Sequence, residues 1–389
     1  MKYIPYGRQF IDKNDISHVI KSLKNDLITT GPYVNAFEKI ISKKLKVPHV
    51  YSCSSGTAAL HLAFLAINLN EGDSIIIPSV NFIASANIAS QMKARIFFSD
   101  VDPLTGQITP NLIKDCIKKN KIKNLKAVVT MYHGGYPRNI IELGLLKKKL
   151  RCFLIEDSCH ALGANYISLK KTEKIGSCKH SDISTFSLHP LKSITAGEGG
   201  IITTRNKLLA EKIKLFRSHG IIRKKKHWEY DVKLKGFNYR LSDINCALAF
   251  SQTKKLDQFI LRRKKIFDLY FKNLNNYKNI CKIIKNEKQT SSAYHLVLIS
   301  INYRKLNADK NDLINFLLKK KIITQYHYIP FYKFTSFKKE LKKHNNKFNG
   351  TKSFLNNVLS LPIYYSLKKE EVLKISQQIK KFVQINLTK

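Results

Sequence analysis

Residues 185–192 read TFSLHPLK, and the glycine-rich stretch GEGG follows at 197–200. The apolar run at 182–187 predicts a short buried strand, and residues 200–204 predict a second strand after a glycine turn. The loop between these strands contains Lys192, in a setting unsuited to a solvated surface charge. A desolvated lysine amine is what a Schiff base with a carbonyl cofactor requires. Taken alone, Lys192 could also be one lysine among many, so its role depends on the surrounding sequence.

Strand and helix patterns alternate on the amino-terminal side of this loop, after two amphipathic helices within residues 13–46. Such alternation predicts an α/β fold with a mainly parallel central sheet and helices on both faces. The predicted strands are 48–52, 74–77, 95–99, 126–130, 151–156, 182–187 and 200–204, and the helices between most of them are 57–68, 83–92, 110–119 and 139–149.

The pattern changes on the carboxyl-terminal side, where longer helices are predicted at 206–217 and 240–275. We expect the second of these to link a large cofactor-binding α/β domain, residues 1–250, to a small α+β domain within residues 251–389. The elements predicted after the link are a strand at 294–299, a helix at 310–320, a strand at 322–328, a mobile surface loop at 338–350 and a helix at 368–384.

The chain of 389 residues is strongly basic, with a formal net charge of +42. Basic proteins often bind nucleic acid, but specific readers of bases favour arginine and interleave aromatic side chains. Here only 11 of the 69 basic residues are arginine, and the lysines are scattered over every segment. The tightest basic cluster is RKKK at 223–226. We therefore expect no nucleic-acid partner, although the charge would attract an anionic substrate.

Seven cysteines, an odd number without a Cys-x-x-Cys pair, predict reduced thiols in a cytoplasmic protein. Cys159 and His160 are adjacent, but no further metal ligand follows at a suitable spacing, so we expect no metal site. The first residues lack the apolar run of a signal peptide, and no apolar stretch is long enough to span a bilayer. The sequence therefore predicts no membrane partner.

A candidate anion site lies at residues 54–60, SSGTAAL, which follow a strand and open a helix. Gly56 permits a tight turn, and the amides of Thr57 and Ala58 would hold a phosphate together with the helix dipole. The hydroxyl group of Thr57 would add a further contact. The alternative is an ordinary serine N-cap.

Residues 155–163, IEDSCHALG, place two carboxylates after an apolar strand. The carboxyl end of a strand in an open α/β sheet is where ligands bind. A carboxylate there can keep a pyridine nitrogen protonated, which makes the ring an electron sink. Glu156 and Asp157 are adjacent and should point in different directions, and we assign the cofactor role to Asp157. The alternative is a helix-capping aspartate.

Two further segments carry candidate ligand contacts. Phe82 begins a helix after a strand, where an aromatic ring can stack on a planar cofactor; a core phenylalanine is the alternative. Residues 236–243, GFNYRLSD, precede the long helix and are rich in groups suited to phosphate or sugar contacts. A capped helix N-terminus is the alternative for that segment.

Together these segments resemble the DegT/StrS family of pyridoxal-phosphate-dependent sugar aminotransferases, which have the fold-type I aminotransferase architecture. The resemblance extends from residues 4–9 (IPYGRQ) to residues 359–364 (LSLPIY), nearly the whole chain. Any single motif is weak, but the ordered set is specific. It comprises SGT at 55–57, ED at 156–157, SLHPLK at 187–192, GEGG at 197–200 and NYR at 238–240.

The resemblance implies pyridoxal 5'-phosphate as the cofactor. Lys192 would form the Schiff base with it, and Asp157 would pair with its pyridine nitrogen; these two are the candidate catalytic residues. In the family, the asparagine of the NYR stretch reaches the phosphate in the partner subunit, so Asn238 would complete the other active site of a homodimer. The remaining implied cofactor contacts are His160 near Asp157, Phe82 on the ring, and Gly56, Thr57 and Ser187 at the phosphate.

The implied reaction transfers the amino group of L-glutamate to a UDP-linked 4-keto-6-deoxy sugar. Segments at 177–182, 216–221 and 326–330 are most similar to family members that aminate the 4-keto position of UDP-2-acetamido-2,6-dideoxy-β-L-arabino-hex-4-ulose in pseudaminic acid biosynthesis. Another nucleotide-linked 4-keto-6-deoxy sugar, of the bacillosamine or perosamine type, is the alternative. Some family members are dehydratases with histidine in place of the lysine, so Lys192 argues against that branch. The candidate substrate contacts are Tyr6, Arg240 and His327.

Overall fold

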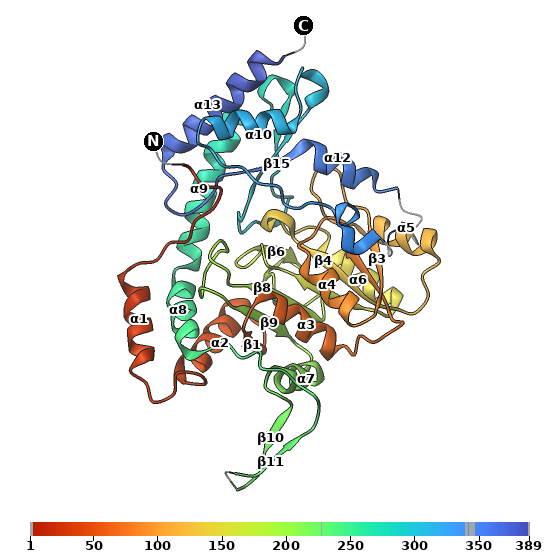
Figure 1. Ribbon diagram of the computed structural model, residues 1–389, viewed down its shortest axis with the longest axis vertical. Helices are drawn as coiled ribbons and strands as arrows, with labels where there is room; N and C mark the ends of the chain where they lie inside the picture. The colour runs from red at the N-terminus through yellow and green to blue at the C-terminus, as the bar shows by residue number, and fades with distance from the viewer. Residues whose placement is uncertain (1–2, 227, 339–340, 342–346, 388–389) are drawn as a thin grey trace.

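The computed structural model describes residues 3–226, 228–338, 341 and 347–387. Its centre is a seven-stranded sheet in the order β1-β9-β8-β5-β4-β2-β3 (Figure 1). Neighbouring strands are parallel except at β9, which is antiparallel to both of its neighbours. The predicted α/β fold with a mainly parallel sheet is therefore confirmed. The strands are β1 (His49–Cys53), β2 (Ser74–Pro78), β3 (Arg95–Ser99), β4 (Leu125–Met131), β5 (Phe153–Asp157), β8 (Ile183–Ser187) and β9 (Gly200–Thr204).

Helices cover both faces of this sheet because its strands are apolar on both sides. All five residues of β2 are buried, and successive side chains of a strand point to opposite faces. Ile75 packs in one core cluster with α3, α4 and α7, whereas Ile76 packs in another with α5 and α6. The helices are α3 (Gly56–Ala66), α4 (Ala84–Gln91), α5 (Pro110–Asn120), α6 (Ile140–Leu150) and α7 (Lys207–Arg217).

The two amino-terminal helices, α1 (Lys13–Leu23) and α2 (Pro32–Leu45), pack against α8 (Asp243–Lys254). The prediction of one helix over 240–275 is wrong, because α8 ends at Lys254 and α9 (Leu256–Leu274) follows. At the break, the Lys255 N–H bonds to the Gln252 and Thr253 carbonyls, which ends the regular α-helical pattern. Lys255 Nζ lies 2.7 Å from Oδ2 of the buried Asp15, so a contact with α1 stabilises the break.

The carboxyl-terminal region contains a three-stranded antiparallel sheet in the order β12-β14-β15, at the top of the view in Figure 1. The division of the chain at residue 250 stays a prediction. Among the described residues, no helix combines the length and apolarity needed to cross a bilayer. The elements of this region are β12 (Cys281–Ile283), β14 (Val297–Ile301), β15 (Val358–Leu361), α10 (Lys310–Lys319), α12 (Asn349–Asn357) and α13 (Lys369–Ile385).

In this region one predicted strand is wrong, and one predicted loop falls mostly on residues that the structure does not describe. Residues 322–328 form no strand; isolated bridges from Ile322 to Ile4 and from Gln325 to Ser360 tie the segment down. The reason is that His327 and Tyr328 turn into a pocket instead of pairing in a ladder. Most of the loop predicted at 338–350 lies outside the described residues, and its last two positions, 349 and 350, are helical because α12 begins at Asn349.

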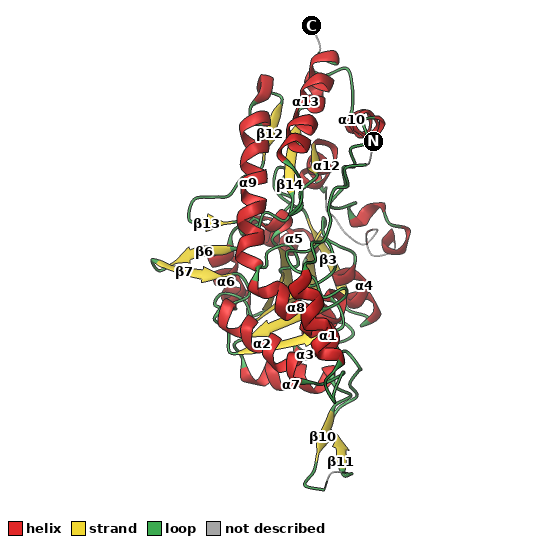
Figure 2. Cartoon of the chain, turned by 90° about the vertical axis from the view of Figure 1, so that its left-hand side faces the viewer, coloured by secondary structure: helices red, strands yellow, loops and turns green. Residues whose placement is uncertain are grey.

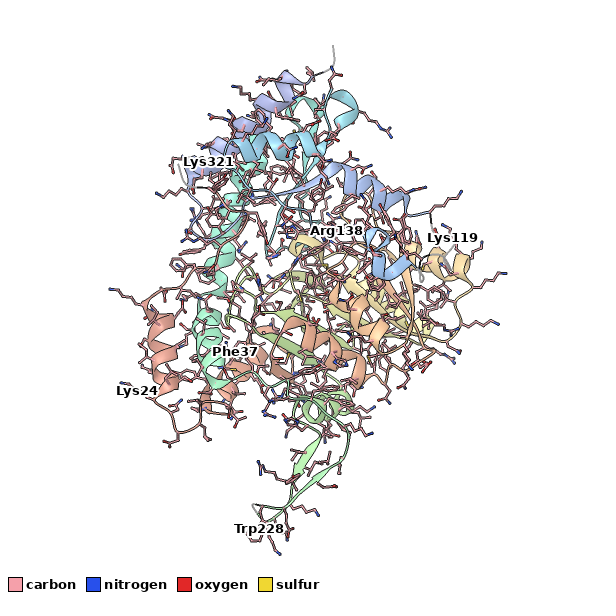
Figure 3. All side chains as sticks on the ribbon, viewed as in Figure 1. Lys24, Phe37, Lys119, Arg138, Trp228 and Lys321 are labelled. Atoms are coloured by element: carbon pink, nitrogen blue, oxygen red, sulfur yellow. The ribbon has the colours of Figure 1, made fainter. Side chains whose placement is uncertain are left out.

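Two hairpins escape sequence analysis because their strands have only three or four residues each, too few for a clear alternation of apolar and polar side chains. The first pairs β6 (Asn165–Ser168) with β7 (Lys171–Lys174), and β13 (Thr290–Ser291) joins it. The second pairs β10 (Ile221–Arg223) with β11 (Tyr230–Val232) and forms an arm that projects from the body of the molecule (Figure 2). Trp228, near the end of the arm (Figure 3), is 64% exposed.

Candidate active site

A pocket of about 360 Å³ opens where β1, β5 and β8 end, the edge of an α/β sheet at which ligands bind. Further lining comes from the amino-terminal segment and from the segment that follows residue 326. The structure does not place the predicted site residues Ala58, His160, Asn238 and Arg240 in this lining. The predicted residues that do line the pocket are Tyr6, Gly56, Thr57, Phe82, Asp157, Ser187, Lys192 and His327.

The amino-terminal end of α3 forms one wall of the pocket. Ser55 Oγ accepts a hydrogen bond from the Ala58 N–H at 3.0 Å, so the N-cap interpretation holds for that amide and corrects its predicted role in an anion site. The amides of Gly56 and Thr57 belong to the first turn and have no acceptor within the helix. A Cβ atom on Gly56 would lie 2.9 Å from Ser187 Cβ. Glycine is therefore needed for the close approach of α3 to β8.

The two adjacent carboxylates face different ways, as predicted. Glu156 Oε1 accepts a hydrogen bond from Tyr132 Oη at 2.8 Å, and only Asp157 lines the pocket. Asp157 is 3% exposed, and its Oδ1 accepts the Cys159 N–H at 3.3 Å. The helix-capping alternative is wrong, because the element after β5 is the strand β6. A buried carboxylate that accepts this one backbone hydrogen bond among the described residues favours a cationic partner in the pocket.

Lys192 lies in the loop after β8 and reaches the same pocket. Burial lowers the pKa of its amine, and the Asp157 carboxylate opposes that shift only in part. A lowered pKa leaves more of the amine neutral near pH 7, and the neutral amine is the form that attacks a carbonyl carbon. The interpretation of Lys192 as an ordinary surface charge is therefore wrong.

Phe82 lies between β2 and α4 and is 51% exposed, which excludes the core alternative. Its ring lines the pocket, with its centroid 5.8 Å from that of Tyr328. An aromatic ring left uncovered on a pocket wall can stack on a planar ligand.

Four histidines gather at the pocket: His133, His160 and His295 are buried, and His327 is half-buried. The His160 ring centroid lies 4.1 Å from that of His295 and 5.9 Å from that of His133. Burial lowers the pKa of all four, to about 3 for His133 and His327 and well below the usual value for His160 and His295. The rings are therefore neutral at physiological pH.

Sequence reasoning predicts His160 as a neighbour of Asp157, but its ring nitrogens bond to the Gly134 N–H and to Tyr328 Oη. It misses Tyr328, His133 and His295. Tyr328 directly follows His327 in the sequence and could have been found with it. The other two histidines come from separate segments, and no local signal connects them to the site.

Asn238 is exposed, and its backbone forms an isolated antiparallel β-bridge with Ser218 at the base of the β10–β11 arm. Neither Asn238 nor Arg240 lines the pocket of its own chain.

The residues of the pocket fit pyridoxal 5'-phosphate. The amides at the α3 end and the close contact of Gly56 with Ser187 suit a phosphate group. The uncovered ring of Phe82 suits a planar heterocycle, and the buried carboxylate of Asp157 suits its protonated nitrogen. In the described part of the chain, no three His, Cys, Asp or Glu side chains are grouped as metal ligands.

A lysine amine with a lowered pKa and a buried carboxylate at the ligand-binding edge of such a sheet are the groups expected of a pyridoxal-phosphate-dependent aminotransferase of fold type I. The family model for the DegT/DnrJ/EryC1/StrS aminotransferase family matches residues 9–380, and the chain belongs to this family. The resemblance and the cofactor inferred from the sequence are thereby confirmed.

Similar proteins are sugar aminotransferases. The UDP-4-amino-4,6-dideoxy-N-acetyl-beta-L-altrosamine transaminase of Campylobacter jejuni subsp. jejuni serotype O:2 is 35% identical over 97% of this chain and 99% of its own. The GDP-perosamine synthase of Escherichia coli O157:H7 is 30% identical over 98% of this chain and 99% of its own. The solved structure of Helicobacter pylori PseC, an aminotransferase involved in the biosynthesis of pseudoaminic acid, aligns with a TM-score of 0.89 at 28% identity, over 99% of this chain and all of the other.

Proposed function

We propose that the enzyme transfers the amino group of L-glutamate to the 4-keto carbon of UDP-2-acetamido-2,6-dideoxy-β-L-arabino-hex-4-ulose, a step of pseudaminic acid biosynthesis. The observation that carries the proposal is the full-length similarity to the altrosamine transaminase. The similarity to PseC supports the same pathway. The net charge of +42 favours the approach of a nucleotide diphosphate.

The cofactor would be held by residues that the pocket brings together. Lys192 Nζ would bind its carbonyl carbon, Asp157 its ring nitrogen and Phe82 the face of its ring. Gly56, Thr57 and Ser187 would hold its phosphate, with Asn238 supplied by a second copy of the chain. When bound, the cofactor supplies an electron sink for the charge that develops at the amino-bearing carbon.

Proton transfer would be the task of Lys192. Because burial lowers its pKa, the released amine can take a proton from the α-carbon of the amino donor near neutral pH. The Asp157 carboxylate would pair with the ring nitrogen of the cofactor, an interaction that favours the protonated ring and the stronger electron sink. Tyr6 and His327 line the same pocket and would contact the sugar.

The test is an amino-transfer assay with L-glutamate and, separately, the two UDP-4-keto-6-deoxy-N-acetylhexosamines that differ in configuration at the 5-position. Amination of the L-arabino ketosugar is expected, and Lys192→Ala is the inactive control. Amination of the D-xylo epimer alone would move the enzyme to a bacillosamine-type pathway. The similarity to the perosamine synthase makes the GDP-linked 4-keto-6-deoxy sugar the third acceptor to assay.

A further inference from the structure

The proton on the His160 ring can be located from its hydrogen bonds. The Gly134 N–H donates to His160 Nδ1 at 3.3 Å. A ring nitrogen that accepts a hydrogen bond carries no proton, so the neutral imidazole has its proton on Nε2. Because burial and the neighbouring His295 keep the pKa of His160 well below its usual value, the ring stays neutral.

His160 Nε2–H therefore donates to Tyr328 Oη, 2.8 Å away. The phenolic oxygen is the acceptor of this bond, so its own proton points in another direction. No group in the described part of the chain accepts that proton, and Tyr328 lines the pocket with Asp157 and Lys192. Burial raises the pKa of Tyr328 well above its usual value. The hydroxyl group thus keeps its proton and presents it as a hydrogen-bond donor.

Tyr328 lines the pocket next to Tyr6 and His327, the two residues proposed to contact the substrate. It follows His327, whose ring centroid lies 5.6 Å from that of Tyr6. Most groups proposed to hold the cofactor come from the ends of the sheet strands and from α3. The Phe82 ring, proposed to face the cofactor, has its centroid 5.8 Å from that of Tyr328, so Tyr328 borders both the cofactor and the substrate. In the second half of an amino transfer the acceptor enters as a carbonyl compound, so a donor at this place meets a carbonyl oxygen.

We propose that Tyr328 donates a hydrogen bond to the carbonyl oxygen of the amino acceptor, with His160 as the residue that positions it. The inference rests on the proposed function, which supplies a keto compound as acceptor. The hydrogen bond draws electron density from the carbonyl carbon and makes it more open to attack by an amine. A donor oriented before the substrate binds needs no reorganisation during the reaction.

The kinetic test uses Tyr328→Phe, which removes only the hydroxyl group. We expect kcat/KM for the acceptor to fall on the order of 100-fold, the usual effect of losing one oriented donor. Tyr326→Phe is the matched control, because Tyr326 Oη donates to Asn311 Oδ1 at 2.8 Å and the residue does not line the pocket. Equal activity of the two variants would overturn the proposal.

The positioning role of His160 has its own comparison. Glutamine at this position keeps one donor and one acceptor, whereas alanine keeps neither. We expect His160→Gln to retain much more activity than His160→Ala, and both to leave the amount of bound pyridoxal phosphate near that of the wild type. Equal losses of activity in the two variants would remove His160 from the proposal.

A spectroscopic measurement separates this role from a purely structural one. The acceptor in this measurement is 2-oxoglutarate labelled with carbon-13 at its keto position, bound to the Lys192→Ala variant loaded with pyridoxamine phosphate. The label identifies the carbonyl stretching band of the bound acceptor in the infrared spectrum. We expect a lower frequency with Tyr328 present than in the Lys192→Ala, Tyr328→Phe double variant, and equal frequencies would refute the hydrogen bond. If the wild type aminates no sugar nucleotide, the proposed function fails, while the band of 2-oxoglutarate still decides the role of Tyr328.

Discussion

At the scale of single residues, the proposed chemistry depends on two side chains at the ends of neighbouring parallel strands. Asp157 ends β5, and Lys192 follows β8, which pairs in parallel with β5 from Ile155 to Asp157. Because parallel strands end at one edge, a carboxylate and an amine that are distant in sequence share one pocket. The burial that lowers the pKa of Lys192 is a product of this arrangement.

Lys192→Ala should abolish turnover and leave the fold intact. None of the ion pairs in the described part of the chain includes Lys192, so its loss removes an amine without breaking a salt bridge. Circular dichroism and the thermal midpoint should match those of the wild type, while amino transfer should fall below detection. Full activity in this variant would contradict the assignment of Lys192.

The histidines at the pocket predict a loss of stability in acid. His133 and His327 have pKa values lowered to about 3, whereas the unfolded chain binds protons at about 6.5. Between these values the unfolded state holds more protons, so the free energy of unfolding should fall as pH drops from about 6.5 towards about 3, by about 1.4 kcal/mol per pH unit for each such histidine.

Urea denaturation across this pH range measures the slope. His133 is the suitable residue to replace, because both ring nitrogens are buried without a hydrogen-bond partner in the described chain. His133→Leu should reduce the slope by the contribution of one proton, whatever its effect on stability at pH 7. An unchanged slope would show that His133 does not stay neutral in the folded state.

At the scale of elements, the contact between the end of α3 and the end of β8 shapes the proposed phosphate site. Gly56 and Ser187 approach so closely that any side chain on Gly56 would displace one of them. The first turn of α3 also supplies the amides that would face the phosphate. The position of one helix relative to one strand therefore sets the geometry of the site.

Gly56→Ala should weaken the binding of pyridoxal phosphate roughly tenfold or more, since an added methyl group in a close contact costs about 1–3 kcal/mol. Fluorescence titration of the apoenzyme measures the dissociation constant. Ser187→Gly removes the clashing Cβ atom, so adding Gly56→Ala to that variant should cause little further loss. If the two losses simply add, the contact does not shape the site.

At the scale of the whole molecule, the pocket of one chain lacks one of its proposed phosphate contacts. Asn238 is exposed at the base of an arm that extends away from the body of the molecule (Figure 2). We propose a homodimer in which Asn238 of each chain serves the site of the other. The exposed Trp228 and Tyr230 on the arm are large apolar side chains that a partner could cover.

Asn238→Ala should weaken retention of pyridoxal phosphate, and mixing variants shows whose site it serves. Lys192→Ala and Asn238→Ala chains, refolded together, should form mixed dimers in which one site has both residues intact. Such dimers should bind cofactor and turn over at that site, with wild-type affinity. If Asn238 served its own chain, the mixture would be no better than Asn238→Ala alone.

The local pattern of apolar residues was sufficient to predict the strands of the central sheet. Each predicted strand from 48–52 to 200–204 lies in it, because an apolar run between turn residues reflects burial between two layers of helices. The same reasoning fails at residues 322–328. This segment has the composition of a strand, but it forms only isolated bridges, and His327 and Tyr328 line the pocket instead of pairing in a sheet. It also fails at Lys255, where a buried aspartate from α1 interrupts a continuous helical pattern.

The order of the motifs along the chain determined the family and the cofactor, and it predicted Lys192 and Asp157 as the residues that serve the cofactor. Only the tertiary structure decided that the Ala58 amide donates to Ser55, that the Phe82 ring is uncovered, and that Tyr328 Oη lies within hydrogen-bond distance of His160 Nε2. The physical reason is that sequence patterns record which residues are buried and how the backbone turns. The direction of a hydrogen bond and the pKa of a buried group depend instead on atoms that distant segments bring within a few ångströms.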